Sequence, residues 1–305
     1  MHSSSSAPMS RVGLVVSLLV CSTMWSSGYL FMKLAAGASV WVMASSRALI
    51  AVACIVAVFL AMGRDPRPRS HEIVPWLVLG TFNGWLPNIM TAEALTMISA
   101  GLGSMIQAIG PIMVALMAHF SLPDERLTLR RTVGVLVGFA GMAVLVGPSA
   151  WSEPAGSLIG IGLMLLVSLS YAFGNIYARA LRDIPAVRLA LGQQAVSALA
   201  STIVTVAFVG RPALGQIVDH APALLGLGLI ATAVPITIFM TLIQRAGTTQ
   251  AAMIGYLIPV WATLLAVIFL GETVGLREIA GALVILAGVW IVTNAPPGAV
   301  RPATA

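Results

Sequence analysis

Three charged side chains lie inside long apolar stretches of the sequence: Lys33, Arg47 and Glu93. A charge at the centre of a bilayer costs at least about 2.5–3.5 kcal/mol, so such residues usually face a protein interior or a water-filled path and serve a function. We therefore predict a gating or proton-coupling role for these three residues. The structural alternative places Lys33 at the lipid interface, where its amine reaches water, and pairs Arg47 with Glu93.

Amides and large aromatic side chains also interrupt the apolar stretches near their middle. An amide in lipid is costly unless it bonds to a neighbouring helix or faces water, and an aromatic face can stack on a substrate or hold a cation. Two interpretations follow, hydrogen bonding between helices and the lining of one central substrate-binding cavity. For the second, the predicted cavity residues are Trp25, Asn83, Asn88, Gln107, Tyr171, Asn175 and Tyr256.

Four prolines stand inside apolar stretches: Pro87, Pro111, Pro235 and Pro259. Proline removes a backbone hydrogen bond and clashes with the preceding turn, at about 3 kcal/mol in a soluble helix. In a membrane, the freed carbonyl must find a partner in the protein or in a cavity. We predict kinks that act as hinges in a cavity wall, with ordinary packing kinks as the alternative.

The sequence offers no pattern typical of catalysis or of a metal site. Cys21 and Cys54 stand singly in apolar stretches, and the four histidines are far apart in the chain. Metal sites need ligands at short, defined spacings. Ser104 and His119 would be about 22 Å apart on one helix, too far for a hydrogen bond. We predict that the protein is not an enzyme and uses neither a metal ion nor a cofactor.

These residues must be positioned by helices in a bilayer, because the composition excludes a soluble fold. Of the 305 residues, 59% are hydrophobic and 9% are charged, whereas soluble domains carry about 25% charged residues. A helix of about 20 apolar residues spans a membrane. The ten predicted windows are 12–33, 40–62, 73–97, 100–120, 129–147, 156–178, 187–209, 222–244, 248–270 and 276–294.

The basic residues are distributed as in a membrane protein. The net charge is +6, but the sixteen Lys and Arg residues are scattered in ones, twos and threes. They form no basic stripe, so we expect no nucleic-acid partner. With a cytoplasmic N-terminus, twelve fall on the cytoplasmic side and four on the other. Because basic residues concentrate on the cytoplasmic side, we predict a multi-pass protein of the cell inner membrane with both termini in the cytoplasm.

The second half of the chain repeats the first. With a shift of 147 residues, Glu125, Gly134 and Gly141 match identical residues, and with a shift of 148, Pro87 matches Pro235. Each half holds five windows, so the halves have opposite orientations, an arrangement typical of transporters with a site between the repeats. We predict an all-α integral membrane protein of ten transmembrane helices in two inverted five-helix repeats. Its predicted parts are a disordered tail at 1–11, repeats at 12–147 and 156–294, and a cytoplasmic tail at 295–305.

The same residues resemble a known family. The segment from Trp25 to Lys33 resembles the first helix of EamA-type members of the drug/metabolite transporter superfamily. Arg47, Pro111 and the Asp-Glu-Arg-Leu segment at 124–127 resemble the rest of one repeat, and Pro259 with Gly271-Glu272-Thr273 resembles its second copy. The resemblance implies an exporter of amino acids or related metabolites, often driven by protons. The YddG-like amino-acid exporters are one candidate branch of this family. The first window has no acidic residue, which argues against the lipophilic-cation export of the small multidrug-resistance relatives.

Together these observations predict a secondary transporter. We expect export of amino acids or related small metabolites by alternating access around a central cavity between the repeats. The alternative is an uncoupled facilitator, or a multidrug or lipid-related transporter of the same superfamily. The expected partners are a small-molecule substrate, the lipid bilayer and protons as a candidate coupling ion, and the expected assembly is a monomer or a weak homodimer.

Overall fold

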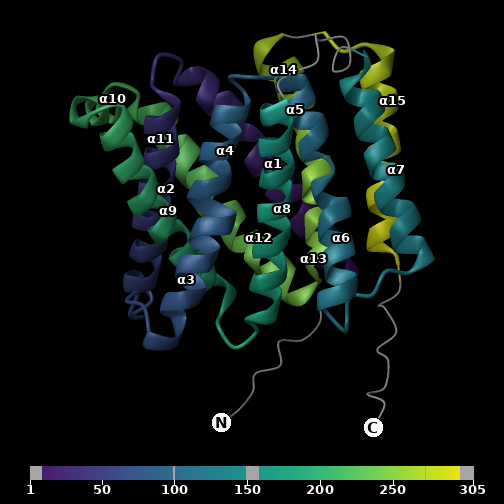
Figure 1. Cartoon of the computed structure of the whole chain (residues 1–305), viewed down its shortest axis with the longest axis horizontal. Coiled ribbons are helices and arrows are strands. Elements are labelled where there is room, and N and C mark those ends of the chain that lie inside the picture. The colour runs from purple at the N-terminus through teal and green to yellow at the C-terminus, as the bar shows by residue number, and fades with distance from the viewer. Residues whose placement is uncertain (1–8, 99, 149–157, 272, 296–305) are drawn as a thin grey trace.

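Membrane-length helices dominate the computed structural model, which describes residues 9–98, 100–148, 158–271 and 273–295 (Figure 1). Within those ranges, eight helical segments are long and apolar enough to cross a membrane. They are α1 (Arg11–Leu34), α2 (Val40–Ala61), α7 (Leu129–Val146), α8 (Leu158–Ala180), α9 (Ala186–Phe208), the α11–α12 segment (Ala221–Arg245), the α13–α14 segment (Thr248–Phe269) and α15 (Leu276–Thr293). The two predicted tails lie almost entirely outside the described residues.

The two remaining predicted windows, 73–97 and 100–120, are each broken into shorter helices, so eight of the ten predicted windows are membrane-length helical segments in the described residues. Pro87 and Pro111 each stand at the second residue of the second piece of their window, where a helix tolerates proline. In the window 73–97, Gly84 has φ −118° and ψ −108°, outside the helical range. The pieces are α3 (Ile73–Gly80), a π-helix (Thr81–Trp85) and α4 (Leu86–Ala94), then α5 (Ala100–Gln107) and α6 (Gly110–Ser121).

The second half carries a matching irregularity. A second π-helix precedes Pro235, as the first precedes Pro87, so both prolines follow a widened turn. Pro259 lies inside α14. Single π-helical turns are often found at functional sites. The pieces are α11 (Ala221–Gly228), the π-helix Leu229–Ala233, α12 (Val234–Arg245), α13 (Thr248–Ala252) and α14 (Ile254–Leu270), and short helices lie at Ser70–Glu72, Arg211–Gly215 and α10 (Gln216–Asp219).

Glycines bring α7 and α15 into backbone contact. A Cβ added to Gly141 would lie 2.6 Å from the Ile285 amide nitrogen, and one added to Gly288 would lie 2.5 Å from that of Gly138. Such separations leave no room for a side chain. The glycines therefore face each other within the chain, and α7 and α15 stand side by side at one edge of the bundle (Figure 1).

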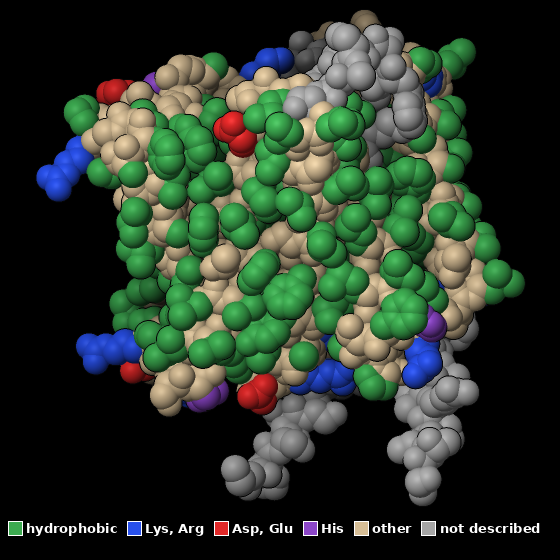
Figure 2. Space-filling model, viewed as in Figure 1, with side chains coloured by type: hydrophobic (Ala, Val, Ile, Leu, Met, Phe, Trp, Pro, Cys, Tyr) green, Lys and Arg blue, Asp and Glu red, His purple; other side chains and the backbone are tan. Residues whose placement is uncertain are grey.

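Helices of the first half pack against helices of the second half. α1 packs on α14 and α12, while α8 packs on α6 and α4, and α2 lies along α9. The surface between the two ends is covered by hydrophobic side chains, whereas charged side chains gather at the top and bottom of the view (Figure 2). A belt of this kind matches the hydrocarbon core of a bilayer. The fold thus places the middle of α1, α2, α8 and the second π-helix at the junction of the halves.

Candidate functional site

Arg47 lies where helices of both halves meet. It stands about 10 Å along α2 from the first residue of that helix. Its Nε donates a hydrogen bond of 3.2 Å to Oγ1 of Thr232 in the second π-helix, and that hydroxyl donates in turn to the Leu227 carbonyl at 2.8 Å. The guanidinium also interacts electrostatically with the hydroxyls of Tyr29 on α1 and Tyr171 on α8. We call these four residues, Tyr29, Arg47, Tyr171 and Thr232, the central cluster.

The central cluster keeps accessible surface on an inward face. Trp25 meets Phe239 of α12 edge-on at 5.0 Å between ring centroids, and Ser26 donates to the Ile258 carbonyl of α14 at 2.8 Å. This face of α1 therefore turns toward the other half. Tyr29 continues the face one turn further and is 56% exposed, and Arg47 and Tyr171 are partly exposed.

The predicted amides form a hydrogen-bonded network between helices. Asn83 Nδ2 donates to Asn175 Oδ1 at 3.0 Å, and Gln193 Nε2 donates to the Asn83 carbonyl at 3.1 Å. That carbonyl is the acceptor that Pro87 leaves free, so the expected protein partner is present. Gly174 makes room for the network, because a Cβ there would lie 2.2 Å from Asn83 Oδ1. The network ties the first π-helix to α8 and α9.

The other predicted cavity residues lie apart from one another. Tyr256 is fully buried, packs on Gly138 and donates to the Val135 carbonyl at 3.2 Å. Its ring thus fills the space between α14 and α7. Gln107 is exposed at the end of α5. Of the seven residues, the structure joins Asn83 with Asn175 directly and brings Tyr171 into electrostatic interaction with Arg47.

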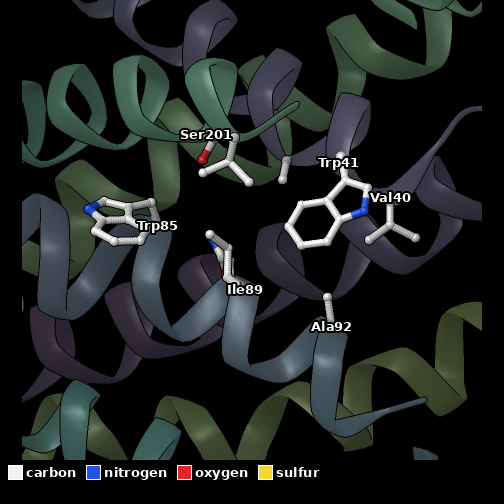
Figure 3. A pocket seen from close by; sticks show the side chains of 9 residues that line it. Val40, Trp41, Trp85, Ile89, Ala92 and Ser201 are labelled. Atoms are coloured by element: carbon white, nitrogen blue, oxygen red, sulfur yellow. The ribbon is translucent and has the colours of Figure 1, made fainter. Parts of the chain in front are cut away.

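Asn88 lines a small apolar crevice between α2, α4 and α9 (Figure 3). The crevice holds about 20 Å³, which is room for a single water molecule. Figure 3 shows Ile89 and Ala92 of α4 between Trp85, the last residue of the first π-helix, and Trp41 at the start of α2. Its volume is too small for a metabolite.

The predicted gating residues are not assembled in this conformation. Glu93 is exposed near the end of α4 and, in the part of the chain that the structure describes, takes part in no ion pair. Arg47 turns toward Thr232 and the two tyrosines rather than toward Glu93. Lys33 is exposed beside the C-terminus of α1. The Arg47–Glu93 pair is therefore absent from the described residues, because the two side chains point to different neighbours.

Two ion-pair networks lie at the end of the bundle opposite Lys33 and Glu93, and they were not predicted from the sequence. In the first, Arg179 Nη2 lies 2.7 Å from Asp124 Oδ2, and Arg179 Nε lies 3.2 Å from Glu125 Oε1. Glu125 also accepts hydrogen bonds from the Thr248 amide at 2.7 Å and the Thr249 amide at 3.0 Å. The Arg179 guanidinium donates to the Ile243 carbonyl as well. This inner network joins the α6–α7 loop, α8, α12 and α13.

The second network joins Arg188 at the start of α9 to Glu72 before α3. Nε and Nη2 of Arg188 each lie 2.5 Å from an oxygen of the Glu72 carboxylate, and both side chains are buried. Burial favours a raised pKa for Glu72, but hydrogen bonds from Arg188 and the Arg69 amide outweigh it and hold the pKa below its usual value. In the same way, Arg179 and Arg182 overcome burial and lower the pKa of Asp124. These carboxylates are thus ionised at neutral pH.

Comparison with known proteins identifies the family. A model described as the EamA-like transporter family matches residues 13–147 and again residues 158–294. Over 293 residues the chain is 28% identical to the uncharacterized transporter YvbV of Bacillus subtilis, covering 94% of this chain and 93% of that protein. A solved crystal structure covers 92% of this chain and 96% of its own with a TM-score of 0.81 at 19% identity, which shows a shared fold.

Two further relatives match a smaller part. A WAT1-related chloroplastic protein of Arabidopsis thaliana is 28% identical over 259 residues, which is 76% of this chain and 58% of that protein, so the chain spans less than two thirds of its length. A protein of Salmonella typhimurium named as a probable amino-acid metabolite efflux pump is 28% identical over 177 residues, covering 55% of this chain and 59% of that protein.

The double family match agrees with the eight membrane-length helices and with the resemblance noted from the sequence. The chain belongs to the EamA-like transporter family and is a multi-pass membrane transporter.

Proposed function

We propose that the protein is an inner-membrane secondary transporter that exports amino acids or related small metabolites by alternating access. The named efflux function of the Salmonella relative supports this substrate class. The proposed substrate path lies between two inverted repeats, at the junction of α1, α2, α8 and the second π-helix. The exchange of contacts between the halves supports that location. The chemistry is transport alone, without catalysis.

The observation that carries the proposal is the difference between the two ends of the molecule. At one end, Arg179, Asp124 and Glu125 tie both halves together through buried ion pairs. Toward the other end, Tyr29 on the inward face of α1 remains largely exposed. We propose that these ion pairs close one end of the substrate path while the end near Tyr29 is accessible, as alternating access requires. The first end is the proposed cytoplasmic one, so this conformation is proposed to face outward.

The proposed topology places both termini in the cytoplasm. Twelve of the sixteen basic residues then lie on the cytoplasmic side, and the first residue of α1 and the last of α15 lie at the same end of the bundle (Figure 1). Single cysteines replacing Asp65 and Pro212 test the topology with an impermeant maleimide. Asp65 should react only from the cytoplasm and Pro212 only from outside. Reaction of both from the same side contradicts the inverted arrangement.

The hinges and the gate are further parts of the proposal. Pro87 and Pro235, each two residues after a π-helix, are proposed to act as hinges for α4 and α12. Glu93, Arg47 and Lys33 are proposed to act on the outer side when the outer end closes. Export of radiolabelled amino acids from loaded proteoliposomes, with and without an imposed pH gradient, tests the function and its coupling. Flux that ignores the gradient would favour an uncoupled facilitator.

A further inference from the structure

The central cluster presents hydrogen-bond donors without acceptors. Arg47 uses Nε on Thr232, and Nη1 and Nη2 have no hydrogen-bond partner among the described residues. The Tyr29 and Tyr171 hydroxyls likewise make no hydrogen bond within that part of the chain, although both interact electrostatically with the guanidinium. Thr232 already donates to the Leu227 carbonyl. The cluster therefore offers four donor groups, on side chains from α1, α2 and α8 that interact with one another.

The cluster also carries one positive charge without a counter-ion. In the described residues, no carboxylate lies within ion-pair distance of Arg47, and no acid or second base acts on it electrostatically. Three other arginines are buried in the described residues: Arg179 and Arg188 are each paired with a carboxylate, and Arg131 interacts electrostatically with Glu125 and Asp124. An unpaired charge within the membrane-spanning part of a protein is costly. An arginine kept in that state can be neutralised by an anion from outside the chain.

We propose that Arg47, Tyr29 and Tyr171 bind the carboxylate of the transported substrate at the junction of the two halves. The inference rests on the proposed function and narrows its substrate class to small molecules with a free carboxylate. The guanidinium fork can hold both oxygens of a carboxylate through Nη1 and Nη2, and the phenols add a donor from each half. The single positive charge fits a monoanion better than a phosphate dianion. Trp25 and Phe239, close by on α1 and α12, offer apolar surface to the remainder of the molecule.

The same arrangement gives the cluster a part in transport. Arg47 and Tyr29 come from the first half, and Tyr171 comes from the second. An anion held by all three joins the two halves and neutralises the charge that otherwise stands unpaired between them. Release on the other side restores the unpaired state. Arg47 is thus reassigned from an outer gate to a substrate-binding residue.

Binding is measured on purified full-length protein by thermal shift and by titration. The probes are L-leucine and L-phenylalanine, their neutral amides, and sodium chloride and inorganic phosphate. We expect both amino acids to raise the Tm and the amides to fail. Arg47→Gln should weaken binding about 10- to 100-fold, the loss expected for charge-assisted hydrogen bonds, and Tyr171→Phe should weaken it less. Arg64→Gln, in the exposed loop after α2, is the matched control and should bind as the unmodified protein does.

A readout without ligand separates binding from a structural role. If Arg47 only held Thr232 in place, Arg47→Gln would lower the Tm of the ligand-free protein, whereas removal of an unpaired charge should leave it unchanged or raise it. Equal binding of amino acids and amides, full binding by Arg47→Gln, or a response to chloride and phosphate alone would each overturn the carboxylate site. The transport proposal is tested separately, by measuring flux in proteoliposomes.

Discussion

The inner network makes a sharp prediction for Glu125→Gln. Glu125 is buried, accepts two backbone hydrogen bonds at the start of α13 and pairs with Arg179. Breaking a buried ion pair by removing one charge costs about 3–5 kcal/mol. Asp124 still holds Arg179 and the glutamine carbonyl can still accept, so we expect about 1–3 kcal/mol. If the pair exists only in the inward-closed state, the equilibrium shifts toward inward opening by about 5- to 150-fold.

The assay follows the labelling rate of a cysteine in place of Met117. Met117 is half-buried on α6 and packs on the cores that α6 shares with α8 and α13, so it becomes accessible when the cytoplasmic end opens. Cys21 and Cys54 are first replaced by alanine, and a maleimide is added to inside-out vesicles. Glu125→Gln should speed labelling, whereas Glu278→Gln, which removes the exposed pair with Arg277, should not. Equal rates in Glu125→Gln and the parent protein would refute the idea that the Glu125–Arg179 pair holds the cytoplasmic end closed.

Three further outcomes follow from the structure. Arg188 lowers the pKa of Glu72, so their ion pair stabilises the fold at pH values above the usual carboxylate pKa. This stabilisation is lost as the pH falls through the lower pKa of the folded protein. When Tm is measured against pH, it should therefore fall more steeply on acidification for the parent protein than for Glu72→Gln. Gly141→Leu should lower the Tm strongly, since even a Cβ lies 2.6 Å from the backbone of α15, whereas Gly162→Ala, with nothing within 4 Å, should not. Glu93→Gln should weaken the dependence of export on external pH if Glu93 couples transport to protons, and an unaltered pH profile would make it a bystander.

Much of the fold could be predicted because a bilayer imposes a simple rule on length and polarity. The start of α7 was expected at 129, and the structure begins it at Leu129, where the Thr128 side chain caps the Arg131 amide. Pro87, Pro111 and Pro235 lie beside breaks or π-helices, whereas Pro259 lies inside α14. The non-helical backbone at Gly84 was not predicted. Which turn widens depends on tertiary contacts that one window does not contain.

The candidate site was predicted only in part, because polarity does not reveal which neighbour a side chain meets. Arg47 was singled out by its depth, but its expected partner was Glu93 rather than Thr232 and the tyrosines. Tyr256 was expected in a cavity, yet the absent side chain of Gly138 leaves a slot that its ring fills. Arg179 was counted only as a cytoplasmic charge. The available signals were that Arg179 matches Lys33 in the repeat and that Asp124 and Glu125 are adjacent acids at a predicted cytoplasmic position. A contact between positions 125 and 179 follows from the fold and not from their spacing in the sequence.

The most direct test of the account is counterflow in proteoliposomes. Vesicles are loaded with unlabelled L-leucine or L-phenylalanine, and entry of the same radiolabelled amino acid is compared for the parent protein, Arg47→Gln and protein-free vesicles. We predict transient accumulation above the protein-free level for the parent protein with at least one amino acid, and its loss in Arg47→Gln with retention in Arg64→Gln. Entry at the protein-free level for both amino acids would contradict the proposed amino-acid transport, and full counterflow by Arg47→Gln would contradict the role of Arg47.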